Sequence, residues 1–407
     1  MTRAFRSLLV ALVLVASVLV TAPAASAYEP PGGAVFNNPQ GAKADRYRIV
    51  NTVNRAIKAA KPGSLIYMSM YLMDSRASFT ALKEARKRGV GVQLVLDVLA
   101  KNGQSKKMAA IFNADNRKIP ANKPQKDEDG VLRKWGPDRS FVRFCQQGCR
   151  GPRSPNHTKF YVFTATGTAK NVVMVSSSNL NKGGANKGYN DLVILKNRAE
   201  LVKNFAFVHA EMAEDSPNDK DGFLEYFQGN VIARFYPKRS AGDPVLADLA
   251  KVKCQGANGG AGKNGRTKIN ISMFRWNNDR GIEIARKLVR LDRNGCDVRV
   301  IYGAPGSTVA DILKTSARNG GVQLWDSRYD FNLDGEIDLR VHHKYMLISG
   351  YYGKDRSSWQ VHTGSRNWGQ SLHAGDENTL NIESRAIYNQ YLKNWQFCVN
   401  KAGRKIT

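Results

Sequence analysis

The sequence is poor in acidic residues and in cysteine, and it has no long apolar run after residue 27. Because a membrane-spanning helix needs about 20 apolar residues, we expect no integral membrane segment beyond that point. No Cys-x-x-Cys pair is accompanied by histidines at zinc-ligand spacing, which disfavours a zinc site. Asp and Glu number 34 against 62 Lys and Arg, so the formal charge is +28. Such an excess favours a polyanionic partner, nucleic acid or an anionic membrane surface, over charge that serves only solubility.

The first 27 residues have the pattern of a secretory signal peptide. Arg3 and Arg6 precede an apolar run of about 13 residues, Leu8 to Val20, which is short for a membrane anchor, and small residues follow it. We therefore expect cleavage after Ala27 and a secreted, extracellular protein, whose charge is +26 once the two arginines are removed.

Disulfide bonds are the expected state of cysteines outside the cell. Cys145 and Cys149 are close enough in sequence to close a tight loop, and Cys254 can pair with Cys296, which leaves Cys398. The odd number of cysteines leaves the connectivity open.

Two segments about two hundred residues apart have the same order of predicted elements. Each begins with a strand-like apolar run, continues with a helix whose apolar residues recur every three to four positions, and ends after a glycine with a second strand. Each therefore resembles a βαβ unit of an α/β sandwich. The three parts lie at 65–71, 79–88 and 92–96 in the first segment and at 269–274, 281–290 and 298–302 in the second.

Turn-forming residues at 234–244 indicate a boundary between two halves. We place the signal peptide at 1–27, the first half at 28–238 and the second half at 245–407. A long polar insertion between Lys101 and Asn156 is rich in Lys and Arg. We expect it to line the mouth of a site, with a solvated surface loop as the alternative.

A His-x-Lys motif occurs at the start of a strand-like run in each half. His157 and Lys159 precede one apolar run, and His342 and Lys344 precede another. In a strand, residues i and i+2 project from the same face, so each motif presents an imidazole beside an ammonium group. Phosphodiester cleavage needs this pair, because a nucleophile attacks phosphorus while cations hold the oxygens whose charge grows in the transition state.

Downstream of each motif, hydroxyl and amide side chains stand at the end of a further apolar run. They are Ser177 and Asn179 in the first half and Ser365 and Asn367 in the second. Such groups supply neutral hydrogen-bond donors to the same phosphate. Two motifs with the same downstream pattern indicate one site built from two half-sites.

The duplicated pattern resembles the phospholipase D superfamily, whose signature is His-x-Lys-x4-Asp followed by Gly-Ser-x-Asn. The resemblance covers nearly the whole chain after residue 27. It implies an α/β fold of two similar α/β/α sandwich halves, packed with pseudo-twofold symmetry around one active site, and a monomer that needs no metal or other cofactor. Two departures stand out, since Thr164 and Ser349 occupy the aspartate positions and Ser176 replaces the first signature glycine.

The resemblance also implies a phosphohistidine intermediate. We assign His157 as the nucleophile and His342 as the acid and base, although the reverse assignment stays open. The groups assigned to the phosphate oxygens are Lys159 and Lys344, helped by Asn179, Asn367, Ser177 and Ser365.

Members of the superfamily carry a later acidic residue that orients each histidine. Glu377 fits the second copy. In the first copy we favour Asp191 over Asn190, because a carboxylate stabilises an imidazolium better than an amide does.

Residues 330–338 match the start of a calcium-binding loop. The bidentate Glu expected at its twelfth position is replaced by Val341. We therefore favour a plain polar turn over a structural calcium site.

Phospholipase D activity is the function that we favour, because one secreted chain carries both motifs. A metal-independent nuclease of the same superfamily is the first alternative, and the basic charge favours it. A non-catalytic binder of anionic polymers or membranes is the second. The expected partner is accordingly phospholipid at an anionic membrane surface or nucleic acid.

Overall fold

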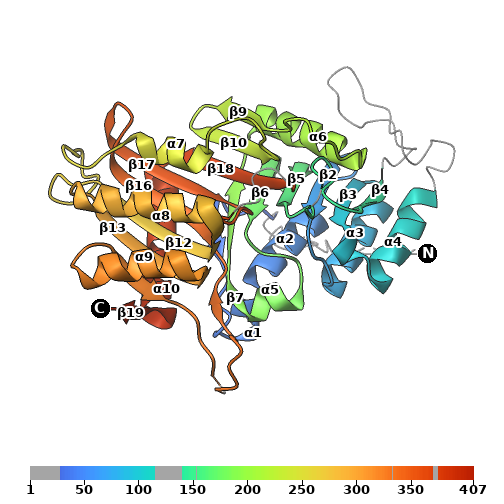
Figure 1. Ribbon diagram of the computed structural model, residues 1–407. Helices are drawn as coiled ribbons and strands as arrows, with labels where there is room; N and C mark the ends of the chain where they lie inside the picture. Colours follow the sequence, from blue (N-terminus) through green and yellow to red (C-terminus); the bar gives the residue numbers. More distant parts are fainter. Residues whose placement is uncertain (1–27, 115–139, 153, 332, 370–374) are drawn as a thin grey trace, which may run out of the picture.

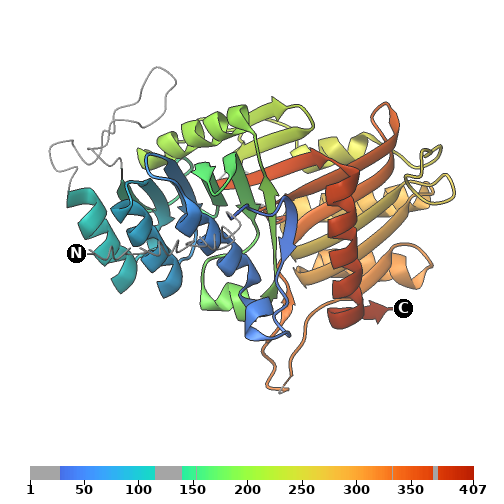
Figure 2. The ribbon, with the colours of Figure 1, turned by 180° about the vertical axis from the view of Figure 1, so that it is seen from behind.

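The computed structural model describes residues 28–114, 140–152, 154–331, 333–369 and 375–407 (Figure 1). The expected signal peptide and residues 115–139 of the insertion lie outside the described residues. Figures 1 and 2 show the blue-to-green half of the chain beside the yellow-to-red half. Within the described residues, no helix combines the length and the apolar character needed to cross a membrane.

The first half is built on a mixed sheet with the strand order β1-β8-β6-β5-β2-β3-β4. β2, β3 and β4 are parallel, whereas β5, β6, β8 and β1 continue the sheet through antiparallel pairs. Every side chain of β2 and β3 is buried, because helices cover both faces, and this explains their nearly continuous apolar runs. The strands are β1 Gly33–Phe36, β2 Leu65–Met70, β3 Gly91–Asp97, β4 Phe141–Cys145, β5 Lys159–Thr166, β6 Ala169–Ser176 and β8 Asp191–Leu195.

The second half repeats this arrangement strand for strand. The order β10-β18-β17-β16-β12-β13-β14 matches β1-β8-β6-β5-β2-β3-β4, with the same parallel and antiparallel pairs. This confirms the predicted α/β fold with two similar halves. The strands are β9 Leu224–Gln228, β10 Val231–Tyr236, β11 Val252–Lys253, β12 Lys268–Trp276, β13 Asp297–Pro305, β14 Gln323–Asp326, β16 Lys344–Tyr352, β17 Asp355–Gly364, β18 Glu377–Glu383 and β19 Arg404–Ile406.

Helices pack on both sides of the sheets. α2, α3 and α4 cover one face of the first sheet, and α7, α8 and α9 cover one face of the second. α6 and α10 contribute to a core that also contains side chains from both sheets, such as Val193 and Val361. Burying one large apolar side chain contributes about 1.5–3 kcal/mol, so this shared core holds the halves together. The helices are α1 Lys43–Arg46, α2 Arg48–Ala59, α3 Arg76–Lys87, the 3₁₀ helix η1 Val98–Ala100, α4 Gly103–Ala114, α5 Lys182–Asn186, α6 Ala199–Ala213, α7 Pro244–Ala250, α8 Asn278–Arg293, α9 Ser307–Arg318 and α10 Arg385–Ala402.

The chain passes to the second sheet earlier than the turn-rich segment at 234–244. β9 and β10, which the sequence boundary places in the first half, pair with each other and with β18 in the second sheet. The crossing therefore lies between the end of α6 at Ala213 and the start of β9 at Leu224. Local sequence does not reveal this, because a strand's apolar pattern indicates that it pairs but not with which sheet.

The insertion between Lys101 and Asn156 is partly regular structure rather than a loop throughout. It contributes α4 and the edge strand β4 to the first half. The Asn113 side chain joins the two, because it bonds both the N–H and the C=O of Val142 at 3.0 Å.

Both cysteine pairs suggested by the sequence form disulfide bonds. Cys145 is bonded to Cys149 directly after β4, and Cys254 after β11 is bonded to Cys296 before β13. Cys398 is buried in α10 and remains a free thiol.

Candidate active site

The two His-x-Lys motifs meet at one pocket between the halves. The pocket has a volume of about 530 Å³ and is lined by both His157 and His342. Each motif ends at the first residue of a strand, Lys159 of β5 or Lys344 of β16, as predicted. The structure therefore combines the two half-sites into one.

Backbone pairing across the halves sets the position of each histidine. The N–H of His157 donates to the carbonyl of Asp376 at 2.9 Å, and the N–H of His342 donates to the carbonyl of Tyr189 at 2.8 Å. The second contact extends the short parallel ladder of β7 (Gly188–Tyr189) with β15 (Arg340–Val341). Each histidine is thus held by the other half of the chain.

The imidazoles have different partners. Nδ1 of His157 lies 2.9 Å from Oε1 of Glu377, whereas Nδ1 of His342 lies 2.8 Å from Oδ1 of Asn190. Both contacts join one half of the chain to the other. Glu377 therefore orients His157 of the first half, and not His342 of its own half as the sequence suggested. The favoured assignment of Asp191 is wrong, because its carboxylate accepts hydrogen bonds from Thr363 and Tyr391 at 2.6 and 2.8 Å.

The signature serines support these partners instead of facing the pocket. Ser177 and Ser365 are fully buried. Ser177 Oγ donates to Asn190 at 3.3 Å, and Ser365 Oγ donates to Glu377. Their predicted contact with the phosphate oxygens is therefore replaced by a positioning role one step further from the substrate.

The two lysines are buried beside the histidines. Nζ of Lys159 donates to the carbonyl of His157 at 2.7 Å, and Nζ of Lys344 donates to that of His342 at 2.6 Å. Burial lowers the pKa of Lys159 to about 7, although Glu377 opposes this, and it lowers the pKa of Lys344 well below its usual value. A bound anion raises the pKa of a nearby lysine and so opposes the effect of burial. A phosphate in the pocket therefore favours the charged ammonium form of both lysines.

Burial also keeps both imidazoles neutral. It lowers the pKa of His157 to about 4 against the opposing charge of Glu377, and it lowers the pKa of His342 well below 6.5 with help from Lys344. The charges of His157 and Lys159 hold the pKa of Glu377 at about 2 despite burial. At neutral pH the free site therefore contains two neutral imidazoles and one carboxylate.

The signature asparagines line the pocket, and their contact with phosphate remains a prediction. Asn179 and Asn367 both belong to its wall. Their Oδ1 atoms accept the backbone N–H groups of Leu72 and Arg275, each at 3.3 Å. This use of the oxygens leaves the NH₂ groups to donate to a ligand.

An aromatic ring stands against each histidine, and the sequence reading missed both. The ring of Tyr71 lies 4.9 Å from that of His157, and the ring of Phe274 lies 4.5 Å from that of His342. The same rings lie 5.3 and 5.1 Å from the Nζ atoms of the two lysines. The signal was the repeated Ser-Met-aromatic sequence at 69–71 and 272–274, where β2 and β12 approach the site.

Comparison with known proteins agrees with this geometry. Residues 53–211 and 263–397 match the family described as cardiolipin synthase, PLD-like domain, and these ranges contain both His-x-Lys motifs. The chain belongs to this family. Its members carry out phosphodiesterase-type and phosphotransfer chemistry. No curated protein sequence matches the chain.

Solved structures support the PLD-like fold. Polyphosphate kinase from Porphyromonas gingivalis aligns with a TM-score of 0.55 at 11% identity, over 91% of this chain and 48% of that one. Phosphatidylserine synthase from Haemophilus influenzae aligns with a TM-score of 0.53 at 14% identity, over 92% of this chain and 87% of that one. This chain thus spans about half the length of the kinase and most of the synthase.

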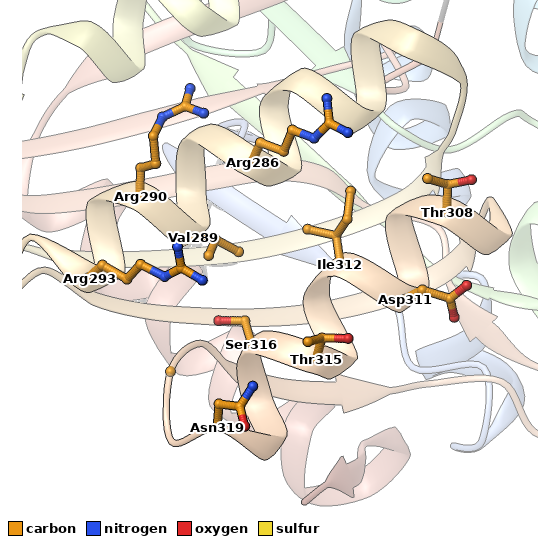
Figure 3. Close-up of a pocket in the computed structure, with 11 residues that line it drawn as sticks. Arg286, Val289, Arg290, Arg293, Thr308, Asp311, Ile312, Thr315, Ser316 and Asn319 are labelled. Carbon is orange, nitrogen blue, oxygen red and sulfur yellow. The ribbon is translucent and has the colours of Figure 1, made fainter.

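The PLD-like protein also has a basic groove outside the active site. A cavity of about 650 Å³ lies between α8 and α9, and Figure 3 shows Arg286, Arg290 and Arg293 along its α8 side. Its wall contains no histidine, although it includes the hydroxyl groups of Thr308, Thr315 and Ser316 and the carboxylate of Asp311. The paired imidazoles and ammonium groups of the His-x-Lys motifs make the other pocket the candidate active site.

The expectation of a plain polar turn at 330–338, rather than a calcium site, remains a prediction. Within the loop, Asp330 accepts the N–H of Gly335 at 2.8 Å, while Asn332 lies outside the described residues. No cluster of three or more His, Cys, Asp and Glu side chains suited to a metal ion occurs in the described part of the chain.

Proposed function

We propose that this protein is a secreted phospholipase D, which hydrolyses the phosphodiester bond of phospholipids through a phosphohistidine intermediate. The observation that carries the proposal is the asymmetric pair of imidazoles in one pocket, His157 on a carboxylate and His342 on an amide. Lys159 and Lys344 add the cations that hold the phosphate oxygens.

In the first step, Nε2 of His157 attacks phosphorus and the bond to the head-group oxygen breaks. The attacking ring becomes positively charged, and the Glu377 carboxylate at Nδ1 stabilises that charge. His342 donates a proton to the leaving oxygen, so that an alcohol departs. A histidine on a neutral amide is the stronger acid of the two, which suits His342 to this role.

In the second step, a water molecule attacks the phosphohistidine. The neutral His342 left by the first step accepts the proton of the water, the bond from phosphorus to nitrogen breaks, and phosphatidate leaves. His157 is then neutral again, and His342 carries the proton, which it releases to solvent as phosphatidate leaves and regains when the next phosphodiester binds. No proton or electron pair is left unaccounted for.

Substrate binding brings His342 into its acid form. In the free site, burial and Lys344 keep this ring neutral at pH 7. A bound phosphodiester adds a negative charge beside the lysines and so raises the pKa of His342. The proton is thus taken up only when a phosphate is present.

A phospholipid substrate has support from two sources. The matched family description names a cardiolipin synthase. Phe331 and Leu333, which are 58% and 87% exposed, lie on the segment between β14 and β15, and that orange segment projects from the body in both ribbon views. Apolar side chains on a projecting loop suit contact with a bilayer.

A nuclease is the second candidate, and the groove in Figure 3 favours it. Arg286, Arg290 and Arg293 form no ion pair within the described residues, and they follow one side of α8. The start of α8 lines the active-site pocket through Asn278. A row of arginines that leads away from the site suits the phosphates of a nucleic-acid strand. A non-catalytic binder of anionic polymers or membranes is the third candidate.

One assay separates the three candidates. Purified protein is offered phosphatidylcholine vesicles and plasmid DNA side by side in chelator, with His157→Ala as the matched control. Phosphatidate release that the control lacks supports the proposal. DNA cleavage without lipid turnover indicates the nuclease, and neither reaction indicates the binder.

Secretion is part of the same proposal and has its own test. Protein collected from the culture medium should begin at Tyr28 when its N-terminus is sequenced. An intact N-terminus on cell-associated protein would contradict secretion.

A further inference from the structure

A small cavity adjoins Lys344 in the second half of the chain. Its volume is about 40 Å³, and its wall includes Lys344, Arg366, Arg234, His362 and the carboxylate of Asp248. One water molecule needs roughly 10–15 Å³ of such space. The cavity therefore holds particles the size of a water molecule or a halide ion.

The guanidinium group of Arg366 is buried without a hydrogen-bond partner. The residue is 3% exposed, and Nε, Nη1 and Nη2 find no acceptor among the described residues. Its carbon Cζ lies 3.9 Å from the ring centroid of Tyr236, which covers one face and leaves the N–H edges unused. Burial and Arg280 lower the pKa of Arg366 only to about 10, so it is charged at neutral pH.

Nearby carboxylates already have other hydrogen-bond partners. Arg234 holds Asp248 through bonds of 2.5 and 3.2 Å, and Arg280 holds Asp243. Glu377 is bound to His157, as described above. The charges of Glu377 and Asp243 partly offset the burial of Arg366, but no oxygen of the described residues accepts its N–H groups. Buried donors without an acceptor are unfavourable, so a partner from outside the chain would stabilise Arg366.

We propose that this cavity binds a small inorganic anion of halide size between Arg366 and Lys344. Among the described residues, neither Arg366 nor Lys344 forms an ion pair with a carboxylate, whereas Arg234 of the same wall is paired with Asp248. The first half offers no equivalent, because Ser178 stands where the second signature has Arg366. The site therefore belongs to one lysine only.

The anion acts on Lys344 through charge. Burial and Lys159 disfavour the charged form of Lys344, and an anion beside it opposes both effects. Lys344 then keeps the ammonium form that grips a phosphate oxygen. The binding of the anion is independent of the proposed function, whereas its effect on turnover rests on it.

Diffraction tests the binding directly. Crystals of the purified protein are soaked in bromide, and anomalous differences are measured at the bromine absorption edge. We expect a peak between Arg366 and Lys344. Density there with no anomalous signal would identify water and overturn the proposal, whether or not any variant folds.

Two variants test the residue in solution. Bromide should raise the melting temperature above that in gluconate of equal ionic strength, and Arg366→Met should lose this rise while Arg286→Met on exposed α8 keeps it. An equal rise in Arg366→Met would contradict the site. With a nitrophenyl phosphodiester, bromide should raise kcat/KM of the wild type about fivefold or more, as expected for coupled sites. Bound bromide without this rise would overturn the link to Lys344 and leave the proposed function intact.

Discussion

Oε1 of Glu377, in the second half of the chain, lies 2.9 Å from Nδ1 of His157, in the first half. The reciprocal contact joins Asn190 of the first half to His342 of the second at 2.8 Å. Each half therefore supplies one histidine and the partner of the other. Neither half contains a complete site, so the symmetry of the fold and the chemistry of the pocket depend on each other.

We predict that one chain is an active unit, because a single molecule contains both histidines and both partners. Light scattering coupled to activity measurement should find turnover in the monomer fraction. Activity confined to a dimer would mean that the pocket is completed by a second chain.

Substitution of His157 and substitution of His342 should impair turnover in different ways. His157→Ala should abolish turnover and form no phosphoenzyme, since no other imidazole in the described part of the chain has the Glu377 partner. His342→Ala should lose roughly two to four orders of magnitude with phospholipid, because proton transfer is missing. It should still form the intermediate with a nitrophenyl phosphodiester, whose leaving group needs no proton. Rapid quench with intact-mass measurement checks this, and an adduct on His342 in His157→Ala would reverse the roles.

Activity should survive EDTA, because Lys159 and Lys344 provide the charge that metal ions supply in other phosphodiesterases. The measurement is turnover before and after dialysis against chelator. Loss that zinc or magnesium restores would defeat the mechanism. Restoration by calcium alone would instead implicate the loop at 330–338.

Stability should fall as the pH drops from 6.5 to 4. Burial lowers the pKa of His209 and of His343 to about 4, so in this window the unfolded chain binds more protons than the folded one. The stability is fully present above pH 6.5 and is lost as the pH falls, by up to about 1.4 kcal/mol per pH unit for each group. Urea denaturation at several pH values measures the slope. His209→Gln should reduce the slope of stability against pH by the contribution of one histidine. A slope equal to that of the wild type would show that His209 does not contribute to the pH dependence.

Much of the candidate site was predictable because it depends on local spacing. A spacing of two residues at the start of a strand places both side chains on the same face, and so puts His157 beside Lys159 and His342 beside Lys344. The partners of the histidines were not predictable in this way. Glu377 and Asn190 reach their histidines across 220 and 152 positions, through backbone pairing between the halves. The sequence prediction favoured Asp191 because a carboxylate stabilises an imidazolium better than an amide does. In the structure, the Asp191 carboxylate instead accepts hydrogen bonds from Thr363 and Tyr391.

The boundary between the halves was misjudged for a related physical reason. Turn-forming residues after β10 mark a change of direction, and the sequence shows that change clearly. The pairing of β9 and β10 with the second sheet depends instead on β18, about 150 residues later. The sequence thus indicated the strands themselves, but it did not indicate with which sheet the strands at the junction pair.

Asn190→Asp tests whether a neutral partner makes His342 the acid. The substitution keeps the side-chain size and places a negative charge near Nδ1 of His342, which raises the pKa of that ring. Because the reaction needs His342 protonated, the alkaline limb of kcat/KM should move up by about one pH unit or more. The weaker acid should also slow phospholipid turnover more than nitrophenyl ester turnover. Asn190 donates to the carbonyls of Gly184 and Gly188 at 2.9 Å, so circular dichroism must show a folded variant. Asn230→Asp, at an exposed turn, adds the same charge as a control and should leave the limb in place. An unmoved limb in Asn190→Asp would show that another group donates the proton.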